Sequence, residues 1–471
     1  MRRLVLILAL IPALASAQIR SWEKYVAPGL VYRMEMDLNK PLTTHILRWS
    51  PKAQSITAKP ELAGATVFSS VDGDAGRETV GTMAARTGAI AGINCDFFPW
   101  NGDPLGAMMK DGQLLSMPAR NRAVFGWGKD KASFARLEST AVAVNNDLII
   151  PIKGLNEECG DNMVVLNTHA CGATYSKEPA KHVVLAFTGV IKPNTPARMR
   201  VETISPDAKS MKVDSGKAIL TGRGKAAEAL AKLKVGMEIK VTFDVAGADL
   251  TGLDQMIGGG PMLVTEGKPD VSLEIEGFKP DFSLTKHPRT AIGQTADGDV
   301  LLVIVDGRQD KLSTGISLPD LADLMIGLGC VSAMNCDGGG SSNLVIFGAS
   351  VNRPSDGEPR PVANGLLLFG ATPFAPVKPD PEAEPEFVIQ GRSLLTMGLF
   401  NQYKVVDRTG QEVPNIEVIW SSTGTAWVDQ GGYLRGVKPG PAVLRATVRG
   451  LSVEIKVTVE EPAKTPPPSR S

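Results

Sequence analysis

A strand, a helix and a second strand are predicted in succession between residues 299 and 337. Residues 299–309, DVLLVIVDGRQ, contain a continuous apolar run, which is typical of a strand covered on both faces. The apolar side chains that follow recur at helical spacing: Leu321, Leu324, Met325 and Leu328. Residues 331–335 predict the second strand. Because such a crossover makes the two strands parallel, Asp306 and Asp337 at their carboxyl ends should share one edge of an open α/β sheet.

A second helix and strand occur earlier in the chain and end in the same way. Residues 78–98, ETVGTMAARTGAIAGINCDFF, predict a helix and then a strand that ends at Asn94 and Asp96. Ligands of open α/β sheets usually bind outside the carboxyl ends of the strands. We therefore predict a site made by the side chains at these ends: Asn94, Asp96, Asp306, Asn335 and Asp337. The alternative is that the aspartates only cap turns.

Three consecutive glycines, Gly338 to Gly340, follow Asp337 directly. Glycine loses more backbone entropy on folding than any other residue, and a turn rarely needs more than one or two of them. The excess indicates that another group must approach this backbone closely. A second triple glycine lies within residues 257–264, IGGGPMLV, where close backbone packing and an anion-binding nest of N–H groups are both open interpretations.

An arginine and a histidine precede a further predicted strand in residues 286–293, KHPRTAIG. Arg289 is a candidate anion ligand, because a guanidinium can hold two phosphate or carboxylate oxygens at once. His287 is either a surface residue or a substrate-binding residue beside Arg289.

Residues 1–17 have the pattern of a secretory signal peptide. Arg2 and Arg3 precede an apolar run, and small residues follow at the cleavage positions: Ala15, Ser16 and Ala17. No later stretch approaches ~18 uninterrupted apolar residues, so no membrane span is predicted after cleavage. The 50 basic and 50 acidic residues balance, which gives no electrostatic reason to expect nucleic acid as a partner. We expect a bacterial protein that is secreted, periplasmic or at the cell surface.

Five cysteines in an exported chain indicate disulfides, with one cysteine left over. Cys159 and Cys171 are close in sequence and are the predicted pair. Cys95 and Cys336 each precede an aspartate of the predicted site, where they could bridge two loops or remain buried thiols.

Domain boundaries are predicted from changes in composition. Residues 18–371 predict a mixed α/β or α+β catalytic domain with a β-rich insertion at about residues 150–250. The proline-rich residues 372–385 predict a linker, and residues 386–460 alternate apolar and polar side chains in short strands. This last pattern resembles bacterial Ig-like group 2 domains, which implies a small all-β sandwich that could contact a cell-surface glycan. Residues 461–471 predict a disordered tail.

Several motifs together resemble the phosphodiester glycosidase family: INCDFF, HPRTAIG, VDGR, STGISLPDLADLM, NCDGGGSS and RPVANG. The resemblance covers most of residues 20–371 and implies a hydrolase that cleaves a sugar-1-phosphodiester into free sugar and a phosphate monoester. The sugar could be similar to N-acetylglucosamine, within a surface or exopolysaccharide glycan. The implied catalytic residues are Asp96, Arg289, Asp306 and Asp337. The implied substrate-binding residues are Asn94, His287, Asn335, Gly338, Gly339, Gly340, Ser341, Arg360 and Asn364.

The chemistry of the predicted residues agrees with this activity. A carboxylate such as Asp337 can stabilise or attack an oxocarbenium-like sugar, while a phosphate leaving group needs a positive clamp and N–H donors. No cofactor is required by this reaction. Two alternatives remain open: a phosphoesterase with Mg²⁺ or Ca²⁺ on Asp96, Asp306 and Asp337, and a non-catalytic glycan-binding surface protein.

Overall fold

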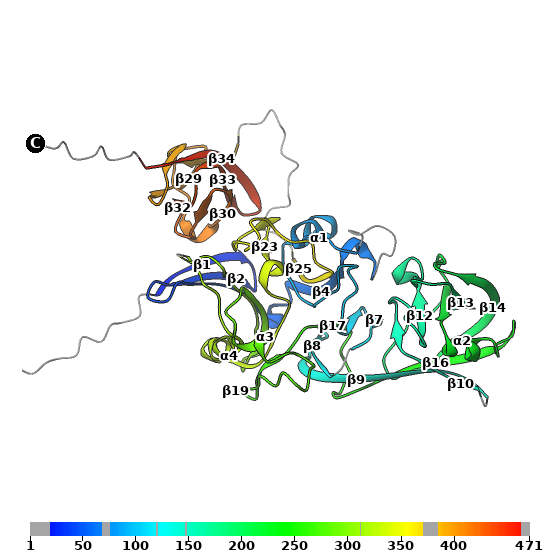
Figure 1. Cartoon of the computed structure of the whole chain (residues 1–471). Coiled ribbons are helices and arrows are strands. Elements are labelled where there is room, and N and C mark those ends of the chain that lie inside the picture. Colours follow the sequence, from blue (N-terminus) through cyan, green and yellow to red (C-terminus); the bar gives the residue numbers. More distant parts are fainter. Residues whose placement is uncertain are drawn as a thin grey trace, which may run out of the picture.

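The computed structural model describes residues 19–67, 76–118, 121–146, 148–310, 312–370 and 385–462 (Figure 1). The predicted signal peptide, nearly all of the predicted linker and most of the predicted tail lie outside these residues. Strands predominate over helices in the described part of the chain, and most strand pairs are antiparallel. Of the described strands, two pairs are parallel: β11 (Gly154–Leu155) with β12 (Val164–Thr168), and β27 (Leu394–Thr396) with β34 (Leu451–Glu460).

An eight-stranded sheet forms the centre of the main unit. Its strands, in spatial order, are β1 (Ile19–Ala27), β2 (Leu30–Asp37), β3 (Leu42–Trp49), β21 (Val300–Val305), β20 (Arg289–Thr295), β22 (Cys330–Asn335), β18 (Met262–Thr265) and β19 (Lys268–Pro269). Every residue of β21 is buried. Leu302 and Ile304 face one core and Leu301 and Val303 face another, which explains the continuous apolar run in the sequence.

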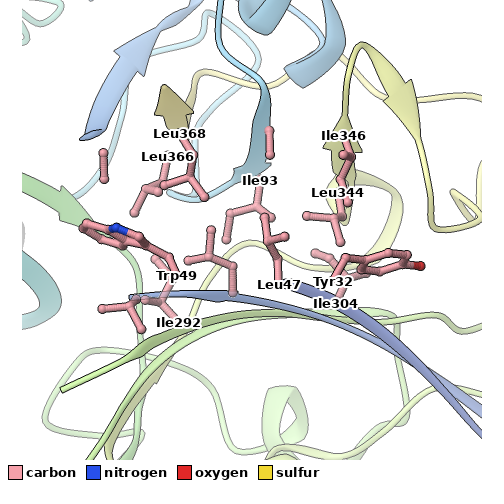
Figure 2. Packing of buried hydrophobic residues seen from close by; sticks show 14 of the residues in the cluster. Tyr32, Leu47, Trp49, Ile93, Ile292, Ile304, Leu344, Ile346, Leu366 and Leu368 are labelled. Carbon is pink, nitrogen blue, oxygen red and sulfur yellow. The ribbon is translucent and has the colours of Figure 1, made fainter. Parts of the chain in front are cut away.

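A five-stranded sheet packs face to face on the eight-stranded sheet. Its strands, in spatial order, are β24 (Ala349–Ser350), β23 (Leu344–Ile346), β5 (Ala91–Asn94), β25 (Asn364–Gly370) and β4 (Ile56–Leu62). Figure 2 shows Leu47 and Ile304 of the first sheet pointing toward Ile93 and Leu344 of the second. Side chains of the two inner faces thus form the main core.

Two helices cover the outer faces of this sandwich. Helix α4 (Leu318–Gly327) buries Leu321 and Met325 against the eight-stranded sheet, and Ser317 caps its N-terminus by accepting a hydrogen bond from the Asp320 N–H. Helix α1 (Val80–Thr87) buries Val80 and Met83 against the five-stranded sheet. The predicted helices and the strands after them are confirmed, and the main unit has the layer order helix, sheet, sheet, helix.

The predicted parallel direction of the two strands is confirmed, but the two strands are not neighbours in the sheet. Strands β21 and β22 run in the same direction, as the crossover requires, but β20 lies between them and is antiparallel to both. The carboxyl ends of β21 and β22 still share one edge of the sheet. The first residue of β20 lies at the same edge, so the predicted juxtaposition survives this correction.

A twelve-stranded sheet extends from the sandwich and carries most of the predicted insertion (Figure 1). Its strands are β6 (Met108–Lys110), β7 (Gln113–Ser116), β8 (Arg122–Trp127), β9 (Ala132–Asn145), β10 (Leu148–Ile152), β11, β12, β13 (Ala180–Ala186), β14 (Ala197–Ala208), β15 (Lys217–Gly222), β16 (Glu238–Ala246) and β17 (Gln255–Gly258). Helix α2 (Lys225–Leu230) packs on this sheet, while α3 (Asp281–Leu284) belongs to the main unit. As a domain boundary, the insertion stays a prediction.

Residues 385–462 form a small all-β unit with its own core around Trp420. Besides β27 and β34, its strands are β26 (Phe387–Gln390), β28 (Phe400–Gln402), β29 (Lys404–Asp407), β30 (Val418–Gly424), β31 (Ala426–Val428), β32 (Tyr433–Gly436) and β33 (Gly440–Val448). The unit contacts the main unit, since Ile419 and Trp427 join the main core and Lys24 Nζ donates to the Asn415 carbonyl at 2.5 Å. Its Ig-like character stays a prediction.

The predicted disulfide between Cys159 and Cys171 is wrong, because all five cysteines are free thiols. Cys159 Sγ lies 3.4 Å from the Thr221 carbonyl oxygen, whereas Cys171 Sγ lies 3.1 Å from the Thr168 carbonyl oxygen. Closeness in sequence did not bring the two sulfur atoms together. In the described part of the chain, no helix has the length and apolar character needed to cross a membrane.

Candidate active site

Three strands of the eight-stranded sheet bring the predicted site residues to one edge. Asp306 follows the last residue of β21, and Asp337 comes two residues after β22. Arg289 begins β20, where it pairs in register with Val305. The alternating strand directions therefore place two carboxyl ends and one amino end side by side.

The five-stranded sheet joins this edge through the end of β5. Asn94 Nδ2 donates to the Asp337 carbonyl at 2.7 Å, and the Asp337 N–H donates to the Cys95 carbonyl at 2.7 Å. Asn94 Oδ1 accepts hydrogen bonds from the Thr290 hydroxyl and from the Asn343 N–H, each at 3.0 Å. Asn94 is thus fully buried and fixes the backbone at Asp337.

Asp337 is partly exposed to solvent as a residue, although its carboxyl is largely desolvated. Desolvation raises the pKa of Asp337 to about 6, while a hydrogen bond from Ser341, the charge of Arg360 and the Gly338 N–H act in the opposite direction. The carboxyl is therefore ionised at neutral pH and can act as a base or nucleophile.

Asp96 is 1% exposed and close enough to Asp337 for the two charges to interact. Its Oδ1 accepts a hydrogen bond from the Phe97 N–H at 2.8 Å, and its Oδ2 accepts one from the Gly106 N–H at 2.6 Å. Burial raises the pKa of Asp96 to about 7, and the charge of Asp337 adds to this rise against the opposing charge of Arg122. Asp96 is thus held at the base of the residue 97–106 loop.

The glycines beside Asp96 are required by close approach. A Cβ atom on Gly106 would lie 2.8 Å from Asp96 Oδ2, and one on Gly258 would lie 2.7 Å from the same atom. Gly258 belongs to the second triple glycine of the sequence, so the packing interpretation of that motif is confirmed at this position.

Asp306 is 2% exposed and makes hydrogen bonds on several sides. It accepts hydrogen bonds at 3.2 Å from His45 Nε2, Asn352 Nδ2 and the Arg353 N–H. His45 Nδ1 in turn contacts the Tyr32 hydroxyl at 2.8 Å. These contacts favour a structural role in which Asp306 holds the loop that carries Asn352 and Arg353; its catalytic role stays a prediction.

The glycines after Asp337 make room for the backbone and for arginine side chains. A Cβ atom on Gly338 would lie 2.7 Å from the Pro288 carbonyl oxygen. A Cβ atom on Gly340 would lie 2.2 Å from Arg360 Nη2. Gly339 has φ +64°, the left-handed region that favours glycine. Gly338 is therefore required by close backbone approach and Gly339 by its φ, whereas Gly340 leaves room for the ends of the Arg360 and Asp356 side chains.

Two arginines and a histidine surround the glycine loop. Arg360 donates to Asp356 Oδ2 through Nε at 3.0 Å and through Nη2 at 2.6 Å. Arg308 is exposed, and its Nη2 donates to His287 Nδ1 at 3.4 Å. Burial and two nearby arginines lower the pKa of His287, so its ring is neutral at pH 7. Arg360 is paired with Asp356, so the exposed Arg308 is the cation on this side that is best placed to meet an anionic group.

Arg289 is 1% exposed and donates to main-chain carbonyls. Its Nη2 donates to Phe282 and to Thr285 at 2.9 Å, and its Nε donates to Ile316 at 3.2 Å. Burial, followed by the charge of Arg308, lowers the pKa of Arg289 to about 10. These contacts favour a structural role for Arg289, in which it holds neighbouring backbone segments in place. That Arg289 clamps a phosphate stays a prediction.

Other predicted substrate-binding residues also hold neighbouring backbone segments in place. Asn335 Nδ2 donates to the Gly260 carbonyl at 2.8 Å, and Asn364 Oδ1 accepts from the Asp96 N–H at 2.9 Å. Ser341 is fully buried. The partly or fully exposed group consists of His287, Arg308, Asp337, Gly338, Gly339 and Arg360. We call this group the accessible set.

Sequence reasoning missed three residues around the site. Arg308 belongs to the quoted motif VDGR, which was the available signal, and its φ of +59° is unusual for a side chain of this size. Arg122 lies over Phe97 and Phe278, with its guanidinium carbon 5.3 and 4.5 Å from the ring centroids. His45 lies in β3, far from the motifs, and no sequence signal identified it.

A metal-holding group is not formed by the predicted aspartates. Among the described residues, no three His, Cys, Asp or Glu side chains come together in a way that could hold a metal ion. Asp96, Asp306 and Asp337 instead have separate hydrogen-bond partners. Their arrangement therefore does not fit the predicted Mg²⁺ or Ca²⁺ ligand set.

Two structures share the fold of this chain. A hypothetical protein from Synechocystis superposes with a TM-score of 0.62 and 22% identity, covering 73% of this chain and 62% of that one. A protein of Burkholderia pseudomallei K96243 described as exported superposes with a TM-score of 0.59 and 24% identity, covering 70% of this chain and 74% of that one.

Sequence relatives match a shorter segment. The SPbeta prophage-derived uncharacterized protein YomE of Bacillus subtilis strain 168 is 39% identical over 113 residues, which is 24% of this chain and 16% of that protein. The N-acetylglucosamine-1-phosphodiester alpha-N-acetylglucosaminidase of Homo sapiens is 32% identical over 110 residues, which is 23% of this chain and 21% of that enzyme. These matches thus span about a fifth or less of each relative.

The family model of phosphodiester glycosidases matches residues 182–369. This segment contains the whole accessible set, whereas Asn94 and Asp96 lie outside it. It is also shorter than the predicted resemblance over most of residues 20–371. Residues 182–369 are thus similar to the phosphodiester glycosidase family.

Proposed function

We propose that this chain is an exported hydrolase that cleaves the glycosidic bond of a sugar-1-phosphodiester and releases free sugar and a phosphate monoester. One observation carries the proposal: Asp337, a partly exposed residue, adjoins a glycine loop flanked by Arg308 and Arg360. The similarity to phosphodiester glycosidases supports it. A carboxylate for the sugar carbon and a positive region for the phosphate are the two groups that this reaction needs.

The reaction assigns a separate role to each side of the site. Water adds to the anomeric carbon as the bond from that carbon to the phosphate oxygen breaks. Asp337 takes the proton from the water, or first attacks the carbon itself and is then released by water. The phosphate monoester leaves with its negative charge held by Arg308 and Arg360. Because a phosphate leaving group is a weak base, it needs little protonation.

In this proposal, the protonation state of Asp96 affects the charge around Asp337. With the pKa of Asp96 at about 7 and that of Asp337 at about 6, one carboxyl is mainly neutral and the other mainly ionised between these pH values. A neutral Asp96 avoids a second negative charge where an anionic substrate must bind.

Export and substrate class belong to the same proposal. The signal-peptide pattern of residues 1–17 supports export, as does the similarity in fold to a B. pseudomallei protein described as exported. The name of the human relative supports a sugar similar to N-acetylglucosamine. A groove of about 810 Å³ between residues 348–359 and strands β30, β31, β33 and β34 could bind a surface glycan through the C-terminal unit.

Product analysis with a panel of sugar-1-phosphodiesters tests the proposal. We expect free sugar and phosphate monoester from at least one diester, with activity retained in chelator. Asp337→Asn should abolish this turnover. Release of sugar 1-phosphate, or loss of activity in chelator, would favour the phosphoesterase alternative. Saccharide binding without turnover of any diester would favour a non-catalytic glycan-binding protein.

A further inference from the structure

We infer that Trp100 is a stacking platform for the sugar part of the substrate, an inference that rests on the proposed function. Trp100 is 68% exposed, whereas Trp49, Trp127, Trp420 and Trp427 are each 5% exposed or less. A large aromatic ring that remains in water offers a flat apolar surface. The C–H face of a pyranose ring is the matching surface on a sugar.

The loop that carries Trp100 is tied directly to Asp96. The loop closes on itself, because the Leu105 N–H donates to the Phe97 carbonyl at 3.0 Å. Its two ends, at Phe97 and Gly106, each donate an N–H to one oxygen of Asp96. Trp100 is four residues from Asp96, so the two Cα atoms are at most about 14 Å apart. One or two sugar rings can span that distance.

The base of this loop is rigid. The Phe97 ring lies 5.4 Å from the Phe278 ring and 5.9 Å from the Phe282 ring. Phe282 in turn lies under the guanidinium of Arg289, 4.9 Å from its carbon. The loop is therefore anchored to the same framework that holds the candidate site. A platform fixed in this way loses little entropy when a ligand binds.

The side chains around the site indicate which part of the substrate meets Trp100. Arg308 and Arg360 lie on the glycine-loop side of Asp337, where the phosphate would bind. Two arginines also lie at the Trp100 loop, Arg77 over Trp100 and Arg122 over Phe97, so charge alone does not exclude phosphate there. The preference for the sugar rests on the indole ring, whose flat apolar face carries negative charge density and fits the C–H face of a pyranose better than a phosphate.

One face of the Trp100 ring already has a partner. The guanidinium carbon of Arg77 lies 5.0 Å from the ring centroid, a cation–π arrangement that orients the indole. An oriented ring with a 68% exposed surface is suited to stacking on its open side.

The test combines kinetics and fluorescence on the full chain. We expect Trp100→Ala to raise KM for a cleaved sugar-1-phosphodiester roughly tenfold with little change in kcat, because stacking contributes to binding before and during the reaction. Trp100→Phe should recover most of the loss. Phe400→Ala is the matched control, since Phe400 is 50% exposed and has the Arg435 guanidinium 5.3 Å from its ring.

Acrylamide quenching of tryptophan fluorescence provides the second measurement. N-acetylglucosamine or glucose should protect the wild-type protein from quenching, and inorganic phosphate should not. Trp100→Phe should lose this protection. An unchanged KM in Trp100→Ala while the wild type cleaves diesters would overturn the platform and leave the proposed function intact. Protection by sugar with no cleavage of any diester would support the platform and overturn the hydrolase, and neither protection nor cleavage would overturn both.

Discussion

Residues 94–96 and 335–337 share the tripeptide Asn-Cys-Asp, and each tripeptide follows a buried strand of one of the two facing sheets. In both, the asparagine side chain holds backbone from another segment and the cysteine is buried. The residues that come next differ. An aromatic loop follows Asp96 and donates an N–H to each of its oxygens. Three glycines follow Asp337, which is partly exposed, and the side chains of Arg308 and Arg360 lie beside these glycines.

This comparison shows that the tripeptide alone does not determine the role of its aspartate. The same three residues give one aspartate that is 1% exposed, with a pKa of about 7, and one that is partly exposed, with a pKa of about 6. The local backbone after the tripeptide decides solvent access, and solvent access decides which carboxyl can meet a substrate.

Replacing the accessible aspartate should have the largest effect. Asp337→Asn keeps the shape and removes the charge, and we expect kcat/KM to fall at least ~10²-fold on every substrate. Steady-state kinetics on a sugar-1-phosphodiester and on an aryl glycoside of the same sugar measure this, with circular dichroism as the folding control. A loss of only a few fold would mean that Asp337 takes no part in the chemical step. The proposed difference between the two tripeptides would then be wrong.

Two arginines near Asp337 should differ in what they affect. Arg308→Ala should lower kcat/KM roughly tenfold for the diester and leave an aryl glycoside unchanged, because only the diester has a phosphate to hold. Arg289→Ala should lower the melting temperature and slow both substrates equally, since Arg289 holds three carbonyls of the framework. A selective loss on the diester in Arg289→Ala would restore the predicted phosphate clamp.

The pH dependence of kcat/KM should reflect the ionisation of both Asp337 and Asp96. As pH rises through about 6, Asp337 loses its proton and kcat/KM should increase. As pH rises through about 7, Asp96 becomes charged beside Asp337 and kcat/KM should decline. The profile is therefore bell-shaped, and Asp96→Asn should remove the decline at higher pH. A decline that persists in Asp96→Asn would assign it to another group.

The smallest effect should be on stability. The folded-state pKa of Asp337 is raised, so the folded chain binds this proton more tightly than the unfolded chain does. The free energy of unfolding therefore falls as pH rises from about 4 to about 6. Above this window Asp337→Asn should stabilise the fold on the order of 1 kcal/mol, after allowance for solvent access to this carboxyl. Below pH ~4 the difference should vanish, because the carboxyl is then neutral in both states. Thermal unfolding at pH 4 and pH 8 measures this, and destabilisation at pH 8 would contradict the raised pKa.

Local patterns in the sequence predicted the elements around the site. The apolar run of β21 and the helical spacing of α4 are short-range signals, and both elements form as expected. Strand pairing is a long-range property, so nothing in residues 299–337 shows that β20 lies between β21 and β22. The predicted edge was correct because the crossover sets strand direction whether or not a third strand intervenes.

Residue roles were harder to predict than residue positions. Arg289 and Asp306 lie at the predicted edge, but carbonyls and side chains from other segments surround them. These partners are distant in sequence, so burial and hydrogen bonding could not be seen in the motifs. Arg308 shows the opposite case, since its motif was noted and its exposure beside the glycine loop was not foreseen.

The most direct test of the account is which bond of the diester is cleaved. Hydrolysis in water labelled with ¹⁸O, followed by mass spectrometry of the phosphate monoester, distinguishes attack on the sugar carbon from attack on phosphorus. We expect a monoester without label, because the oxygen that bridged sugar and phosphorus leaves with the phosphate. Incorporation of ¹⁸O into the monoester would mean attack on phosphorus and would contradict a glycosidase at Asp337.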